Sequence, residues 1–286
     1  MGNLVAGKAT AEVAAGDARA NGGGALPSDG AGGPRVRSAI PTIHRWRDLD
    51  RHDRRWALAV GAALLLAPLA ALVHYVPDWA PAGDPALMGL RSLDVGTAAT
   101  PLIGQPSASS AYTEGVRNVH HPGPLHFYLM AVPVRVLGGA FGMLLVSVLI
   151  TGTCLAASAW AVFRQLGRRA GVVAAGALAM VAFTTGASSL VDPTSSNISG
   201  YPLLASTVLL WCVACGDLRL VPAAAGAVSF TAQQHLAVVP ATLVLSVGAV
   251  ALLAVTGWRR GWWHDRARRR DLARSSAWAG AVALVL

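Results

Sequence analysis

The sequence has little charge, few cysteines and almost no lysine. Only 13% of its 286 residues are charged, whereas 54% are hydrophobic. A composition this apolar excludes an ordinary soluble domain and predicts an all-α, polytopic helical membrane protein. Lys8 is the only lysine, so arginine carries nearly all of the positive charge, a bias that is typical of a high-GC bacterial genome.

The scarcity of cysteine excludes a zinc site built on cysteine pairs. The three cysteines all lie inside apolar runs, at Cys154, Cys212 and Cys215. The one C-x-x-C pair has no second pair to complete the four ligands that zinc requires. We therefore expect these residues to be small apolar fillers within helices.

The N-terminal segment 1–56 lacks a periodic apolar pattern and is rich in Gly, Ala, Ser, Asp and Pro. This composition predicts a disordered cytoplasmic tail, which ends in a cluster of arginines. The apolar run at 56–76 has about 20 residues, enough to cross a bilayer. It lies too far from Met1 for a signal peptide and has no small-x-small cleavage motif, so we interpret it as a retained anchor.

Further apolar runs predict a membrane domain over 57–275. The expected spans lie at about 138–163, 170–187 and 201–215, with two more on either side of a Gln-Gln-His turn at 233–235. The positive-inside rule places the N-terminus and every arginine-rich connection in the cytoplasm of a bacterial plasma membrane. The loop at about 77–123, the Asp192 loop and the 233–235 turn then face outward. The net charge of +9 is therefore a topology signal and not a nucleic-acid footprint.

The last part of the chain combines a basic segment with an apolar end. Trp258, Trp262 and Trp263 flank the basic segment and are typical of an interfacial aromatic belt. The apolar run at 276–286 is too short to span a bilayer. We expect it to be the start of a further, truncated span, which makes the chain the N-terminal part of a longer protein.

The loop at about 77–123 concentrates ionisable groups, which are costly near a bilayer and tend to mark function. Asp84 followed by Pro85 has the pattern of a helix N-cap with proline in the first turn. Asp84 is therefore either the cap of a short surface helix or a fixed carboxylate that can act as a base. Arg91 and Asp94 follow on the same predicted helix, where a solvated face is the alternative to a functional role.

The end of this loop has an unusual pattern of histidine and proline. Pro122 and Pro124 bar a helix before about position 124. The apolar segment 124–137 is too short to span and favours a re-entrant helix. His120 and His121, being adjacent in an extended chain, point to different sides and are poor joint metal ligands. One of them is expected to serve a phosphate or a proton transfer, with simple solvation as the alternative.

Four pieces of the chain resemble the C-type superfamily of polyprenyl-phosphate-dependent membrane glycosyltransferases, which includes protein O-mannosyltransferases and aminoarabinose and arabinofuranosyl transferases. These pieces are Gly83-Asp84, the HPGPLHFY segment at 121–128, Leu137-Gly138 and the stretch 192–201. The resemblance implies inverting transfer of a sugar from a polyprenyl-phosphate donor to an acceptor on the outer face. Several members of the superfamily carry an acidic pair where this chain has Asp84-Pro85. The resemblance therefore decides neither metal dependence nor the identity of the transferred sugar.

The resemblance also implies roles for individual residues. Asp84 would be the general base. Asp94, on the same predicted helix, is a further catalytic candidate that does not follow from the resemblance. Cations would neutralise the departing lipid phosphate, and the available groups are Arg91, Arg117, His120 and His121.

A substrate groove is expected from the other two outward connections, at Asp192, Asn197, Gln234 and His235. Asp192 before Pro193 repeats the helix-start pattern, so a capped interhelical loop is the alternative for that stretch. The Gln-Gln-His turn interrupts an apolar stretch, and polar groups at membrane depth usually face a cavity or a partner helix.

The expected partners are the polyprenyl-phosphate sugar donor, membrane lipid and an acceptor that is a glycan, a lipid or a protein, but not nucleic acid. No cofactor and no set of metal ligands is predicted. The sequence does not decide whether the protein uses a divalent cation. The alternative function is a non-enzymatic polytopic protein, either a transporter or an envelope-assembly scaffold. Transporters tend to show internal repeats and polar groups near the midplane of their spans. The gathering of ionisable groups in one loop favours the enzyme instead.

Overall fold

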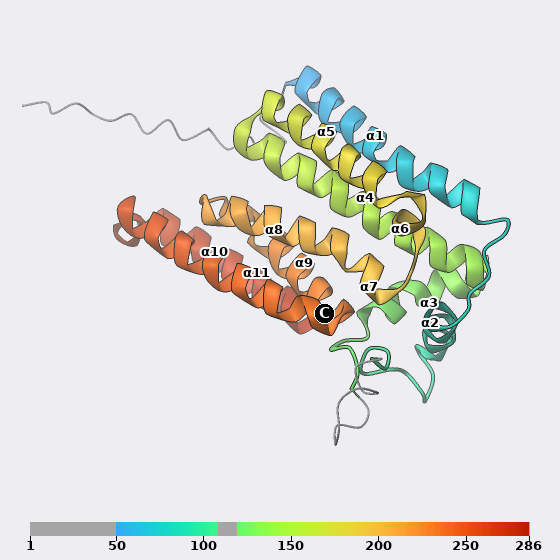
Figure 1. The fold of residues 1–286 in the computed structure, drawn as a ribbon. Helices are drawn as coiled ribbons and strands as arrows, with labels where there is room; N and C mark the ends of the chain where they lie inside the picture. The colour runs from blue at the N-terminus through green and yellow to red at the C-terminus, as the bar shows by residue number, and fades with distance from the viewer. Residues whose placement is uncertain (1–49, 108–118, 286) are drawn as a thin grey trace, which may run out of the picture. The chain divides into compact units, whose positions relative to one another are not determined.

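The computed structural model describes residues 50–107 and 119–285, and these residues are almost entirely helical. Within these ranges there is no β-strand, only an isolated bridge between Pro106 and His120. The elements in chain order (Figure 1) are α1 (Arg51–Tyr75), α2 (Asp84–Asp94), α3 (Leu125–Leu137), α4 (Gly139–Leu166), α5 (Arg168–Thr185), α6 (Ala187–Val191), α7 (Ser195–Ile198), α8 (Gly200–Ala214), η3 (Leu218–Leu220), α9 (Val221–Gln234), η4 (Leu236–Val238), α10 (Val239–Arg259), η5 (Trp262–His264) and α11 (Arg266–Val285). The predicted all-α class is confirmed.

Four helical segments are long and apolar enough to cross a membrane, namely Arg51–Tyr75, Gly139–Leu166, Ser195–Ala214 and Leu236–Arg259. The spans expected at 170–187 and before the 233–235 turn form α5 and α9, which have 18 and 14 residues and are not among the four. Residues 276–285 of the last apolar run continue the basic segment as the second half of α11. The number of crossings and the side of the N-terminus stay predictions.

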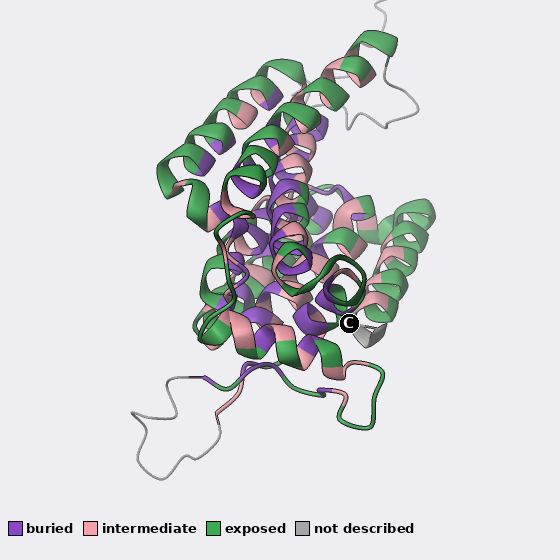
Figure 2. Ribbon diagram, turned by 90° about the vertical axis from the view of Figure 1, so that its right-hand side faces the viewer, coloured by how far each residue is buried: buried purple, intermediate pink, exposed green. Residues whose placement is uncertain are grey.

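The helices α4 and α8 lie at the centre of the helix bundle. About half of the most apolar windows of Gly139–Leu166 and Ser195–Ala214 is buried (50% and 56%), against 22% in α1 and 11% in α10. The outward faces of the helices are exposed, as Figure 2 shows. Exposed apolar faces on long helices are expected where lipid tails cover them.

Close packing at α4 depends on glycine, because lipid tails remove the hydrophobic driving force between helices and leave van der Waals contact. A Cβ on Gly152 would lie 2.1 Å from Leu65 Cδ2 of α1, and one on Gly142 would lie 2.5 Å from the Pro133 backbone of α3. Both neighbouring helices therefore approach α4 at positions that have no side chain.

Two helix starts differ from the sequence predictions. Helix α1 begins at Arg51, inside the segment expected to be disordered, because the Asp50 side chain accepts a 2.6 Å hydrogen bond from the Asp53 backbone N–H and caps it. Helix α2 begins at Asp84 itself, so Gly83 and not Asp84 occupies the N-cap. Gly83 takes a φ of 57°, a conformation that favours glycine.

The short apolar helix expected at 124–137 is present as α3, from Leu125 to Leu137. Pro133 lies inside α3 without ending it, and Gly138, with a φ of 89°, separates α3 from α4. The cluster of Met88, Phe127, Met130, Val134, Met143 and Val146 packs α2 onto α3 and α4. The Arg135 guanidinium also donates to the Leu93 carbonyl at 2.8 Å and to the Val95 carbonyl, which ties the end of α2 to α3. The depth of α3 in a membrane stays a prediction.

Candidate functional site

A small polar cavity lies where the first loop, α2, α3, α7 and the end of α9 come together. Its lining consists of Met88, Gly104, Gln105, His121, Gly123, His126, Phe127, Ser195, Gln233 and Gln234. The three connections that the sequence predicted on one side of the membrane thus each contribute residues to one place. The arginine-rich connection through Arg219 lies at the opposite end of α9.

The loop residues of the cavity are held by backbone pairing between its two ends. Gly104 N–H donates to the His121 carbonyl at 3.0 Å, and His121 N–H donates to the Gln105 carbonyl at 2.9 Å. A Cβ on Gly104 would lie 2.8 Å from the His121 Cβ and carbonyl oxygen, so the pairing requires glycine there. This pairing brings the side chains of Gln105 and His121 to one cavity.

The end of α9 fastens this loop to α3. The Gln233 carbonyl accepts from Gly123 N–H at 3.4 Å, and its side-chain Oε1 accepts from Leu125 N–H, also at 3.4 Å. Gln233 therefore caps the first turn of α3, where backbone donors have no partner within the helix. A Cβ on Gly123 would lie 2.1 Å from Gln233 Oε1, so this approach also requires glycine.

Three buried side chains of the cavity carry polar atoms that have no hydrogen-bond partner among the described residues. They are Gln105, His126 and Gln234, with exposed fractions of 5%, 4% and 2%. The atoms concerned are Gln105 Oε1, both ring nitrogens of His126 and both amide atoms of Gln234. Leaving a buried polar group unsatisfied costs about 1–3 kcal/mol. Native proteins rarely accept that cost three times in one place unless water or a ligand completes the bonds.

The cavity has the size and chemistry for one hydroxyl group. It leaves about 10 Å³ for the centre of a water molecule, which is room for about one water. The glutamine amides and a neutral imidazole each offer both a donor and an acceptor. A hydroxyl also donates and accepts, so either a water or an alcohol group can complete these bonds.

His121 is a neutral member of this group. Its pKa is lowered to about 4, mainly by burial and then by the charge of His235, while Asp84 raises it and His120 adds a smaller lowering effect. Its Nδ1 accepts from the Leu236 backbone N–H at 3.4 Å, and its ring lies 4.6 Å from that of His235. With Nδ1 as acceptor, the proton of the neutral ring is on Nε2. His121 can thus donate one hydrogen bond to a phosphate but brings no charge.

Asp84 lies near the cavity without lining it. It is exposed in the first turn of α2, and Met88, four residues later on the same helix face, lines the cavity. Its charge acts on His121, which raises the pKa of that imidazole against the effect of burial. An exposed carboxylate in this place can reach both solvent and a group bound at the cavity mouth.

The structure does not bring Arg91 and Asp94 into the cavity. Arg91 Nη1 donates to Asp94 Oδ2 at 2.9 Å, forming an ion pair along α2. Asp94 is therefore a weaker candidate for a base, and Arg91 is only partly available to a phosphate. Of the other predicted phosphate ligands, His120 lies in the bridge beside the cavity, and Arg117 lies outside the described residues.

The predicted groove residues divide into two groups. Asp192 accepts at 2.9 Å from both the backbone N–H and the hydroxyl of Thr194, and its other oxygen accepts from Asn197. Asp192 thus engages the residues around the start of α7, whereas Ser195, the first residue of that helix, lines the cavity. Gln234 is in the cavity, and His235 contacts it through the ring of His121.

Gln105, His126 and Ser195 were not singled out from the sequence. His126 had a detectable signal, because it is an ionisable residue within the apolar segment of α3, and such residues tend to be functional. Gln105 and Ser195 had none, since single polar residues in loops are common.

These observations define the class of the protein as a helical membrane protein with a buried polar cavity at one end of its helices. Comparisons with protein-family models, with curated proteins and with solved structures find no match. Among the residues that the structure describes, no three His, Cys, Asp or Glu side chains are grouped to hold a metal ion. The functional argument therefore depends on the side chains of the cavity.

Proposed function

We propose that this protein transfers a sugar from a polyprenyl-phosphate donor to an acceptor on the outer face of a membrane. The observation that carries the proposal is the group of buried side chains with unpartnered polar atoms, Gln105, His126 and Gln234, near the carboxylate of Asp84. Sugars present many hydroxyls, and neutral amides and imidazoles can bind them without attracting ions. One sugar hydroxyl enters the cavity, and the ring lies at its mouth beside Asp84.

In this reaction Asp84 is the general base. Its carboxylate takes the proton of the acceptor hydroxyl while that oxygen forms a bond to the anomeric carbon. The bond from this carbon to the phosphate oxygen breaks on the opposite face, and polyprenyl phosphate departs with the bonding electrons. Attack and departure on opposite faces invert the anomeric centre. Base catalysis of this kind contributes about 10²- to 10⁴-fold to the rate.

The leaving phosphate needs donors rather than a complete set of cations. The Nε2–H of neutral His121 supplies one hydrogen bond, and His120 beside it is a second candidate. Arg117 stays a predicted ligand, and Arg91 is engaged by Asp94. Hydrogen bonds to a charged acceptor are the stronger kind, so a few well-placed donors suffice.

The test compares two carboxylates of one helix. Sugar transfer from radiolabelled polyprenyl-phosphate sugars would be measured in proteoliposomes for Asp84→Asn and Asp94→Asn. We expect a loss of about 10²- to 10⁴-fold in kcat for Asp84→Asn and less than about tenfold for Asp94→Asn, whose carboxylate is paired. Wild-type rates in Asp84→Asn would remove the base role. No transfer by the wild type from any polyprenyl donor would favour the transporter or scaffold.

A further inference from the structure

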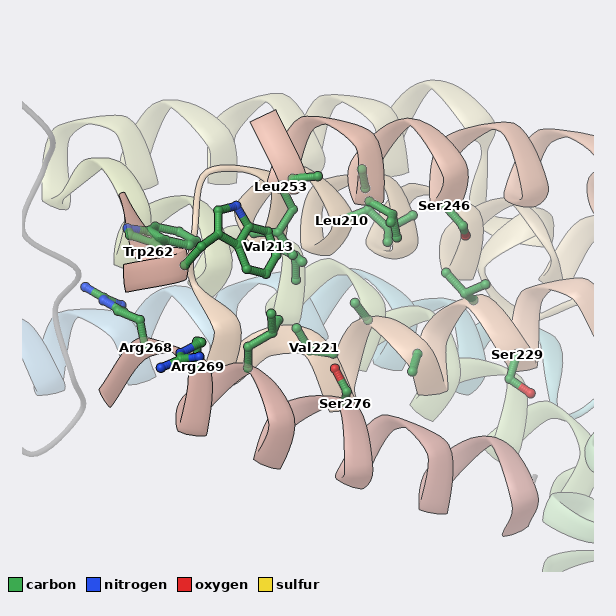
Figure 3. A pocket seen from close by; sticks show the side chains of 18 residues that line it. Leu210, Val213, Val221, Ser229, Ser246, Leu253, Trp262, Arg268, Arg269 and Ser276 are labelled. Carbon is green, nitrogen blue, oxygen red and sulfur yellow. The ribbon is translucent and has the colours of Figure 1, made fainter. Parts of the chain in front are cut away.

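A second cavity lies at the other end of α9 and is apolar. It is a groove of about 530 Å³ between α8, α9, α10 and α11, within the usual size of ligand sites. Along its length the lining is almost entirely aliphatic, with members such as Leu210, Val213, Val221 and Leu253. Figure 3 shows Trp262, Arg268 and Arg269 together at one end, with Ser229 and Ser246 toward the other.

At the cationic end of this groove, stacking on the Trp262 ring fixes the position of arginine side chains. The Arg268 and Arg260 guanidinium carbons lie 5.3 and 5.5 Å from the centroid of the Trp262 ring. The ring itself is held in place by Gly216, where a Cβ would lie 2.7 Å from Trp262 Cη2. Stacking on the indole orients Arg268 at the mouth of the groove.

These arginines are available for an anion. No ion pair involves Arg268 or Arg269 among the described residues. Two carboxylates lie close along the chain. Asp265 accepts from the backbone N–H groups of Ala267 and Arg268 and caps α11, and Asp271 forms no ion pair with either arginine among the described residues. Charge at this end is therefore mainly positive, next to a long apolar channel.

The groove has the length of one membrane leaflet. Ser246 lies about 13 residues before the end of α10, roughly 20 Å along the helix axis, and half of the hydrocarbon layer is about 15 Å. At the far end Ser229 Oγ accepts from Gln233 Nε2 at 3.2 Å, so a polar contact separates the groove from the polar cavity. An occupant whose anion lies at Arg268 and Arg269 thus belongs to the arginine-side leaflet.

We propose that this groove binds an anionic phospholipid, with its phosphate between Arg268 and Arg269 and one acyl chain along α9 and α10. Charge at the mouth, apolar lining and leaflet length together favour this occupant, because basic sites between membrane helices recognise anionic headgroups. On the predicted topology the lipid comes from the cytoplasmic leaflet. The site is separate from the proposed sugar-transfer site and does not depend on it.

The test is native mass spectrometry of the purified full chain, titrated with phosphatidylglycerol or phosphatidylcholine. We expect one retained lipid with preference for phosphatidylglycerol, and a roughly 30-fold weaker affinity for it in Arg268→Gln/Arg269→Gln, since each basic residue near a headgroup contributes about fivefold. Arg270→Gln/Arg274→Gln removes the same charge from the same helix at positions that do not line the groove and is the matched control. Equal binding of both lipids by the wild type, or equal losses in the two double variants, would overturn the proposal.

A second pair of variants tests the acyl-chain part independently. Val250→Trp fills the groove from α10, whereas Val255→Trp puts the same ring on an exposed position of α10 outside the lining. We expect Val250→Trp to abolish the retained lipid and Val255→Trp to keep it, with both proteins monodisperse on size exclusion. Retention by Val250→Trp would overturn the assignment of the groove to the chain.

Discussion

The buried charges at one end of the helices form an ion pair, whereas neutral polar side chains gathered around one cavity at the other end lack hydrogen-bond partners. Beside the ion pair, Gln165 Oε1 is a single neutral atom that also lacks one. At the arginine-rich end, Arg164 of α4 donates to Asp217 through Nε at 2.7 Å and Nη2 at 3.0 Å. At the opposite end of α9, Gln105, His126 and Gln234 find no partner among the described residues. Both groups are buried, so burial alone does not explain the difference.

The difference follows from charge. An unpaired charge inside a protein costs several kcal/mol, so a buried guanidinium and carboxylate persist only as a pair. A neutral amide or imidazole costs about 1–3 kcal/mol when unsatisfied, which a protein can bear until water or a ligand arrives. The ion pair at the paired end therefore has a structural role, and the unpaired end, where three such neutral side chains line one cavity, is the candidate for function.

The largest effect is expected from breaking the paired end. Arg164→Met leaves Asp217 buried without a partner and should lower the free energy of unfolding by about 3–5 kcal/mol. Chemical denaturation in micelles would measure it. The double variant Arg164→Met/Asp217→Leu should recover most of the loss, and Arg168→Met, at an exposed position nearby, should change little. Equal stability of the wild type and Arg164→Met would refute the structural role of the pair.

The next largest loss of stability is expected from a substitution that pushes the end of the 77–123 loop away from α9. The added methyl of Gly123→Ala would lie 2.1 Å from Gln233 Oε1, and overpacking of this kind typically costs about 1–3 kcal/mol. Thermal unfolding and protease cleavage of the loop would report the loss. Gly176→Ala in α5, where nothing lies within 4 Å, is the control and should be neutral or slightly stabilising.

A smaller effect concerns the pH dependence at the unpaired end. The folded pKa of His121 is lowered from 6.5 to about 4, so between these values the unfolded chain binds more protons. The free energy of unfolding should therefore fall as the pH drops from 6.5 toward 4 and then level off. His121→Gln should remove this component. Asp84→Asn should lower the His121 pKa further, because the Asp84 charge raises it. Nitrogen-15 NMR of labelled histidine would measure the shift, and an unchanged or higher pKa would contradict it.

The smallest effect on stability is expected at Gln234, where it distinguishes an unpartnered buried side chain from a partnered one most directly. Gln234→Leu removes unsatisfied atoms and should leave the free energy of unfolding unchanged or raise it by up to about 1 kcal/mol, while sugar transfer falls at least about tenfold. Thr231→Val on the same helix breaks a 3.1 Å hydrogen bond with Ser206 and should cost about 1 kcal/mol. A comparable loss of stability in Gln234→Leu would mean that its amide is satisfied.

The sequence predicted the helices better than the site. The apolar run and the prolines predicted a helix at 124–137, and α3 begins one residue later and ends at the predicted residue, Leu137. Asp84 was placed one residue off its true helix position because the conformation of Gly83 is not visible in a pattern. Asp94, the second catalytic candidate, forms an ion pair with Arg91, and the sequence pattern did not predict this local pairing. Asp192 likewise has a local hydrogen-bond partner in Thr194.

Composition and hydropathy by themselves determined that this chain is a helical membrane protein, because lipid requires each spanning segment to satisfy its own backbone. They also indicated that three connections share one end. Only the tertiary structure decided which side chains meet there. Gln105, His126 and Gln234 come from a loop, α3 and α9, and their contact depends on long-range packing through Gly104 and Gly123. Hydropathy reports the preference of each segment for lipid, and it carries no information about which buried polar groups find partners.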